Sequence, residues 1–138
     1  MSLFKIFDIA GSAVSSQSQR LNTVASNLAN VDTVAGPDGK SYKARQVTFQ
    51  TVMMNTPDGA PGAGVRVAGV SEDQSPGRRV HDPASPSADA EGYVTYSNVN
   101  AVDEMVNMIS ASRSYQNNIE VMNTAKNLLM KTLQMGQG

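Results

Sequence analysis

The sequence predicts an α+β, mainly α protein, in which long N- and C-terminal heptad helices pack as a coiled-coil-like pair around a small irregular β/loop middle region. Three observations favour this class. All six prolines lie between Pro37 and Pro86, so neither end contains a helix breaker. Both ends carry apolar residues at heptad spacing. The middle instead combines turn-forming residues with short alternating segments. These features divide the chain into residues 1–33, 34–98 and 99–138.

Residues 1–33 show the first heptad pattern. Its apolar residues recur every seven positions, with a complementary series between them: Phe7, Val14, Leu21 and Leu28, then Leu3, Ala10, Gln17, Val24 and Val31. The remaining faces carry mainly Ser, Thr, Asn and Gln rather than the Glu and Lys typical of a solvated helix. An ordinary helical hairpin explains the apolar series but not the charge-poor faces, which favour close packing against several neighbours.

Residues 99–138 contain a second pattern of the same length. Its positions alternate by three and four residues, and three apolar residues flank them: Met105, Met108, Ser112, Tyr115, Ile119, Met122, Lys126, Leu129 and Leu133, with Val102, Val106 and Ile109. Thirty helical residues extend about 45 Å. We therefore expect an elongated molecule rather than a sphere with a pocket.

The middle region holds short strand candidates at residues 42–53, 65–70 and 93–96. It contains too few large apolar residues to enclose a core alone, so any small sheet needs support from neighbouring elements. Loops are expected between the candidates. Residues 55–64 combine Pro and Gly without periodicity and predict a connection that is mobile or ordered by a partner.

Composition excludes several function classes. The 138 residues include 11 basic and 12 acidic side chains, which leaves no basic excess to bind nucleic acid. With no Cys and one His, the chain has no thiolate nucleophile and no recognisable metal-ligand set. No segment approaches the ~20 apolar residues of a membrane span. Lys5 and Asp8 interrupt the N-terminal apolar residues, so we expect neither membrane insertion nor a cleaved Sec-type signal peptide.

Two local patterns resemble catalytic or nucleotide sites and fail on closer inspection. His81 lies beside Asp82 and near two serines, but a catalytic triad must converge in a rigid pocket, which a Pro-rich loop does not provide. The run 39–41 resembles the end of a phosphate-binding loop, yet Val34 stands where that motif needs Gly. We therefore expect no enzyme activity and no cofactor.

The residues nevertheless carry a clear resemblance to a known family. Residues 6–13, 20–22 and 25–30 resemble the start of the bacterial flagellar rod, hook and hook-associated axial proteins, and Ala29 to Thr33 fits their Ala-Asn-x-x-Thr signature. Residues 104–116 and 120–126 resemble the closing helix of the proximal-rod branch almost throughout. One departure is Ser97, which stands where that branch usually has Pro.

This resemblance implies a structural subunit of the flagellar basal-body rod, the drive shaft that transmits motor torque across the periplasm. Such subunits leave the cell interior unfolded and uncleaved through the flagellar type III export apparatus. The implied partners are other copies of the chain, neighbouring rod proteins, and the inner-membrane ring and rod-junction protein. The implied location is the basal body.

The resemblance and the heptad patterns together predict which residues form the assembly interface. They are Phe7, Val14, Leu21, Val24, Leu28, Met105, Met108, Ile109, Tyr115, Ile119, Met122, Leu129 and Leu133. The family signature turn comprises Asn27, Ala29, Asn30 and Thr33, and Asn30 is expected to cap the end of the first helix. An alternative remains open at this point: a soluble helical-hairpin adaptor that binds a partner through its Met-rich C-terminal helix.

Overall fold

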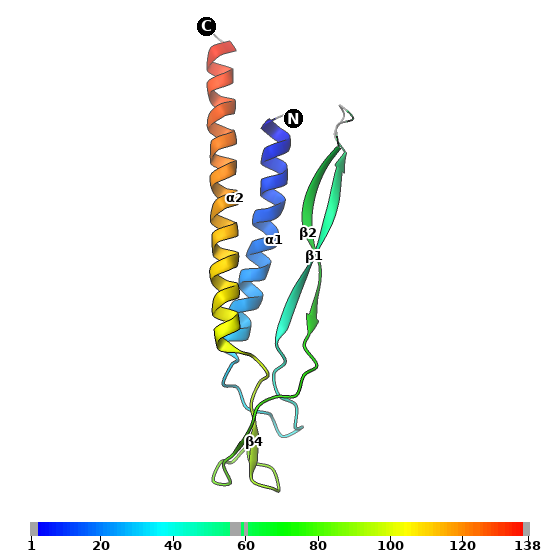
Figure 1. Cartoon of the computed structure of the whole chain (residues 1–138), viewed down its shortest axis with the longest axis vertical. Coiled ribbons are helices and arrows are strands. Elements are labelled where there is room, and N and C mark those ends of the chain that lie inside the picture. Colours follow the sequence, from blue (N-terminus) through cyan, green and yellow to red (C-terminus); the bar gives the residue numbers. More distant parts are fainter. Residues whose placement is uncertain (1–2, 56–58, 60, 137–138) are drawn as a thin grey trace.

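The computed structural model of the chain describes residues 3–55, 59 and 61–136. Its elements follow in the order α1 (Leu3–Ala29), β1 (Arg45–Asn55), β2 (Pro61–Glu72), β3 (Arg79–His81), β4 (Tyr93–Thr95) and α2 (Ala101–Gly136). The molecule is elongated: α1 lies between α2 and the β1–β2 hairpin, and the short β3–β4 ribbon lies at one end (Figure 1). The predicted α+β, mainly helical class is confirmed.

The two helices run antiparallel and differ in length (Figure 1). α1 has 27 residues and α2 has 36, so they extend about 40 Å and 54 Å. The start of α1 lies beside residues 121–128 of α2, so the last turns of α2 extend beyond α1. At its own start, α2 is capped by Asn100, whose Oδ1 accepts from the backbone N–H groups of Val102 at 3.0 Å and Asp103 at 3.2 Å.

The β1–β2 hairpin is longer than predicted. Its antiparallel register pairs Arg45 with Glu72 at one end and Asn55 with Pro61 at the other, with a bulge between Thr48 and Phe49. Residues 61–64, expected to be loop, therefore belong to a strand, whereas residues 56–58 and 60 of that segment lie outside the described residues. Composition alone did not indicate this strand, because Gly normally suggests a loop. Here Gly62 and Gly64 lie against α1, where a side chain would collide with Lys5 or Ser12.

The other strand predictions are confirmed in part. β4 covers residues 93–95 of the predicted 93–96, and Tyr96 forms an isolated bridge with Val34. β3 was not predicted, because three exposed residues carry no alternating apolar signal.

The core is thin and built from small side chains. Among the described residues, the buried apolar ones are all alanine or valine: Ala10, Val24, Ala44, Val94, Ala111 and Ala125. Alanines at helix contacts allow the two backbones to approach closely, but they remove little apolar surface from water. The helix pair therefore gains limited stability from its own packing.

Candidate assembly interface

The face of α2 that packs inside the molecule follows a heptad pattern. Its buried and half-buried positions alternate by four and three residues: Glu104, Met108, Ala111, Tyr115, Asn118, Met122, Ala125 and Leu129. One half of this series coincides with the predicted one. The other half lies one residue earlier than predicted, at Glu104, Ala111, Asn118 and Ala125. The two alanines among them allow the helices to approach closely.

The predicted interface residues occupy three kinds of environment. Val24 is buried. Half-buried positions form the largest group: Val14, Leu21, Leu28, Met108, Tyr115, Ile119, Met122 and Leu129. The exposed members are Phe7, Met105, Ile109 and Leu133. The exposed members remain available to a neighbouring molecule, while the others contribute at least partly to contacts within the chain.

Exposed apolar residues form a stripe at the foot of α2, which is its N-terminal end. They recur at the i, i+3, i+4 and i+7 positions that share one helix face: Val102, Met105, Val106 and Ile109. Their exposed fractions run from 55% to 68%. A contiguous exposed apolar face of this kind is typical of a contact surface.

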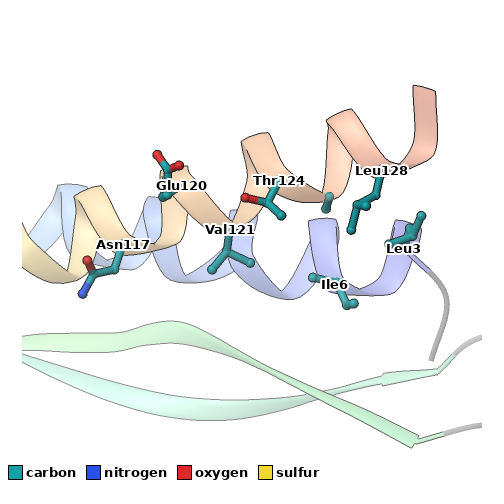
Figure 2. Close-up of a pocket in the computed structure, with 8 residues that line it drawn as sticks. Leu3, Ile6, Asn117, Glu120, Val121, Thr124 and Leu128 are labelled. Carbon is teal, nitrogen blue, oxygen red and sulfur yellow. The ribbon is translucent and has the colours of Figure 1, made fainter. Parts of the chain in front are cut away.

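A second apolar region lies where α1 begins. A cleft of about 440 Å³ separates the helices there, with Leu3 and Ile6 from α1 and Val121 and Leu128 from α2 among its walls (Figure 2). On the other side of the helix pair, Phe4 and Phe7 line a smaller apolar groove of about 320 Å³. Phe4 is 66% exposed. Both grooves have the apolar lining that a helix from another subunit requires.

The signature turn is organised around Asn27, which is 0% exposed. Its side-chain amide pairs with the backbone of Arg45 at the start of β1: Nδ2 donates to the carbonyl oxygen at 2.8 Å, and Oδ1 accepts from the N–H at 2.9 Å. The Tyr42 hydroxyl donates to the same Oδ1 at 2.9 Å. Asn27 therefore does not cap α1 but joins the helix to the hairpin.

Asn30 ends the helix. Its Nδ2 donates to the Ser26 carbonyl oxygen at 2.8 Å, and the Thr33 hydroxyl donates to its Oδ1 at 3.2 Å. The same carbonyl also accepts from the backbone N–H of Asn30 at 3.2 Å, so this residue closes the last helical turn with both its backbone and its side chain. Asn30 does not adopt a positive φ, so the left-handed form of the cap is absent from this residue. Ala29 is the last residue of α1 and is exposed, as is Thr33.

A second cluster of amide and hydroxyl groups, half-buried at Asn98 and buried at Ser97, joins the segments before α2, and sequence reasoning assigned it no role. Asn98 accepts from the Ala44 backbone N–H at 2.6 Å and donates to the carbonyl oxygens of Asp73 and Ser75. Ser97, 3% exposed, donates from its hydroxyl to the Val31 carbonyl oxygen at 2.8 Å. A proline at position 97 could not form this bond, so the departure from the family pattern adds a tie to the end of α1.

The small polar residues of α1 meet the hairpin. The Ser12 hydroxyl accepts from the Val65 N–H at 3.1 Å, and the Ser16 hydroxyl donates to the Val65 carbonyl oxygen at 3.3 Å. A side chain on Gly62 would meet Lys5, and one on Gly64 would meet Ser12. Part of the charge-poor surface of α1 thus packs against the chain's own hairpin, whereas Ser15, Gln19 and Asn22 remain exposed. A sequence signal for this contact exists: Ser12 and Ser16 are four residues apart on one helix face, and Gly62 and Gly64 are two residues apart on one strand face.

Ionic contacts are concentrated at the β3–β4 end. Arg79 pairs with Asp89 at 3.2 Å and Glu91 at 3.6 Å and lies over the Tyr93 ring. The pKa of Asp89 is lowered, chiefly because the Tyr93 backbone N–H donates to its carboxylate. Hydrogen bonds from Ser75, led by its hydroxyl, likewise lower the pKa of Asp73. These hydrogen bonds and ion pairs hold the loops around the short strands.

The remaining features give no sign of a chemical site. His81 is exposed and packs edge-on against Tyr93, with 5.0 Å between the ring centroids. Across residues 3–55, 59 and 61–136, no three His, Asp or Glu side chains gather closely enough to bind a metal ion. No helix in the described part of the chain has a stretch long and apolar enough to cross a bilayer.

Two known protein families match the sequence of this chain. The family described as "Flagella basal body rod protein" matches residues 7–37, and that described as "Flagellar basal body rod FlgEFG protein C-terminal" matches residues 90–135. The matched segments include most of α1 with its signature turn and nearly all of α2.

Curated relatives match over their full length. The flagellar basal-body rod protein FlgC of Escherichia coli O6:H1 is 58% identical over 137 residues, which cover 99% of this chain and 100% of the relative. With the same coverage, FlgC of Salmonella typhimurium is 57% identical over 140 residues, and FlgC of Buchnera aphidicola subsp. Acyrthosiphon pisum is 48% identical over 139 residues. The chain therefore belongs to the FlgC family of flagellar basal-body rod proteins, as its sequence resemblance predicted.

Proposed function

We propose that this chain is a structural subunit of the proximal rod, which polymerises through its terminal helices into the drive shaft that transmits motor torque across the periplasm. Its role is mechanical rather than catalytic. Heterologous contacts that do not close into a ring generate a helical filament, which is the geometry that a rod requires. The three segments 1–33, 34–98 and 99–138 would then supply the inner helix, the outer β/loop region and the closing helix.

The observation that carries this proposal is the distribution of apolar side chains. The buried ones are small, whereas larger ones remain exposed on both helices: Phe4, Met105, Ile109, Leu128 and Leu133 among them. Isolated helices are marginal in water and gain most of their stability from packing an apolar face. An assembly that covers these residues supplies the packing that the single chain lacks. We assign the predicted interface residues to that contact, with the exposed ones foremost.

The proposed partners follow from family membership. They are other copies of the chain, neighbouring rod proteins, and the inner-membrane ring and rod-junction protein. We further propose that the chain reaches the periplasm through the flagellar type III export apparatus without cleavage of a signal peptide. Comparing the mass of the chain in isolated basal bodies with that of its translated sequence tests this last point.

Hydrogen exchange of the purified chain, alone and within isolated basal bodies, tests the assembly proposal. We expect the α2 amides near the stripe at residues 102–109 and beyond residue 121 to gain strong protection on assembly. A helical-hairpin adaptor, the alternative that the relatives do not favour, would instead show equal protection in both samples. Equal protection would overturn the proposal.

A point variant separates folding from assembly. Ile109→Ser removes an apolar side chain that is 56% exposed, so the isolated chain should keep its circular dichroism spectrum. We expect this variant to reduce incorporation into basal bodies and swimming. Ser110→Ala, an exposed neighbour on the same helix, is the matched control and should behave as wild type. Normal rods with Ile109→Ser would remove this stripe from the interface.

A further inference from the structure

Glu104 is an unusual residue for the first turn of a helix, because its side chain is buried. It is 9% exposed, and its Oε2 has no hydrogen-bond partner. Glu104 forms no ion pair within residues 3–55, 59 and 61–136. Arg20 and Arg45 line a neighbouring cleft together with Glu104. The Nη2 of Arg20 donates to Asn107 Oδ1 at 3.5 Å instead, and Arg45 pairs with Glu72 at 3.9 Å. A buried carboxylate without a partner is costly, so a retained one points to a group that pairs with it elsewhere.

The carboxylate lines a cleft of about 380 Å³ at the foot of α2. Asp73 and Asp103 also line this cleft, and no basic side chain of the described residues does so. The other lining groups are mainly amides, including those of Asn98 and Asn107. The cleft therefore offers carboxylate and amide oxygens to a cation. The three acids do not gather closely enough to form a metal site within the described part of the chain, which favours an extended cationic side chain over an ion.

The charge distribution along α2 indicates where such a side chain comes from. The first turn carries Asp103 and Glu104, whereas the far half carries the exposed Lys126 and Lys131. Neither lysine forms an ion pair with any described residue. These lysines lie about 33 to 40 Å from Glu104 along the helix, so they cannot reach the cleft of their own chain. An acidic foot and a basic far end are complementary only between molecules stacked head to tail.

We propose that the acidic cleft at Asp73, Asp103 and Glu104 receives a lysine side chain from the far end of the adjoining subunit's closing helix in the assembled rod. This inference rests on the proposed function and names one contact within it. The inserted ammonium group would supply the partner that Glu104 Oε2 lacks. The cleft would then fix the axial register between successive subunits, which the apolar stripe beside it cannot do alone because apolar contacts are not directional.

Two measurements on the Glu104→Gln variant test the proposal. In the isolated chain, this change removes an unpaired buried charge, so the midpoint of thermal unfolding should stay the same or rise. In isolated basal bodies, it should make the rod dissociate at lower salt concentration than wild type and reduce swimming. Asp103→Asn tests the same cleft from an exposed position and should weaken the rod in the same direction. Asp8→Asn, which neutralises an exposed carboxylate on α1, is the matched control and should change neither property.

Carbodiimide treatment of basal bodies identifies the partner, because it joins a carboxylate and an amine that already touch. We expect peptides containing Asp103 and Glu104 to be joined to a lysine-bearing helix end of an adjoining subunit. Cross-links only to Lys43 of the same chain would overturn the proposal, as would Glu104→Gln rods that match wild type. Lower stability of the isolated Glu104→Gln chain would show an internal partner such as Arg20 and also overturn it. Absence of the chain from basal bodies would instead refute the proposed function.

Discussion

Replacing Asn27 with alanine tests whether one buried amide holds α1 to the hairpin. The side chain makes three hydrogen bonds of 2.8 to 2.9 Å, two with the Arg45 backbone and one with the Tyr42 hydroxyl. A typical hydrogen bond contributes about 1 kcal/mol net, and each buried group left without a partner costs about 1–3 kcal/mol. A water molecule that enters the space left by the amide can replace part of the lost bonding. We expect the free energy of unfolding to fall by about 2–4 kcal/mol.

The assay is urea unfolding of the purified chain followed by circular dichroism, in sucrose so that a marginal fold has a complete baseline. Tyr42→Phe removes one of the three bonds and should lower the free energy of unfolding by about 1 kcal/mol. The double variant should lose less than the sum of the two, because both changes remove the same bond. Asn27→Asp keeps the acceptor but loses the donor to the Arg45 carbonyl, so it should destabilise at least as much as alanine. An Asn27→Ala chain within about 0.5 kcal/mol of wild type would refute the reasoning.

Three further outcomes are expected. A side chain on Gly77 would collide with a backbone carbonyl oxygen, so Gly77→Ala should lower the free energy of unfolding by about 1–3 kcal/mol. Gly69→Ala, which enters open space, should leave it unchanged. The pKa of Asp89 is lower in the folded chain than in the unfolded chain, so its carboxylate stabilises the β3–β4 end at pH values above the unfolded pKa. Hydrogen-exchange protection of this end should therefore decrease when the pH is lowered past about 4. Asp89→Asn should show no such decrease, because its protection is already low at neutral pH. Leu129→Asp places a charge in the half-buried apolar groove and should abolish rods and motility, whereas the exposed Gln134→Asp should not.

The helices could be predicted from sequence because their signals are local and repeated. Absence of proline and heptad spacing identified both, and Met108, Tyr115 and Met122 lie in the predicted register. The alternating positions were misplaced by one residue: strict heptad spacing selects Ser112 and Lys126, whereas the helix contact buries the preceding Ala111 and Ala125, which are 0% and 4% exposed. Close approach between helices favours small volume, a property that a search for large apolar residues misses.

The junctions could not be predicted because they depend on partners far apart in sequence. Asn27 was identified by its family motif, but its role depends on Arg45, 18 residues away. Asn98 reaches Ala44 across 54 positions. Nothing local to either asparagine distinguishes such a tie from an ordinary helix cap. Glu104 was overlooked for a related reason, since an acidic residue in a first helical turn is normally solvated.

The antiparallel pairing has a practical consequence for labelling the protein. α1 begins and α2 ends at the same end of the molecule, and the β3–β4 ribbon lies at the opposite end (Figure 1). A fluorescent domain fused to either terminus would therefore obstruct the same apolar grooves. Moving it from one terminus to the other would not remove this obstruction. The loop that joins β3 to β4 lies at the end of the molecule away from those grooves (Figure 1), and its Pro86 and Ser87 are exposed. A short epitope inserted there should leave the helix surfaces unobstructed and report the position of each subunit in the intact basal body.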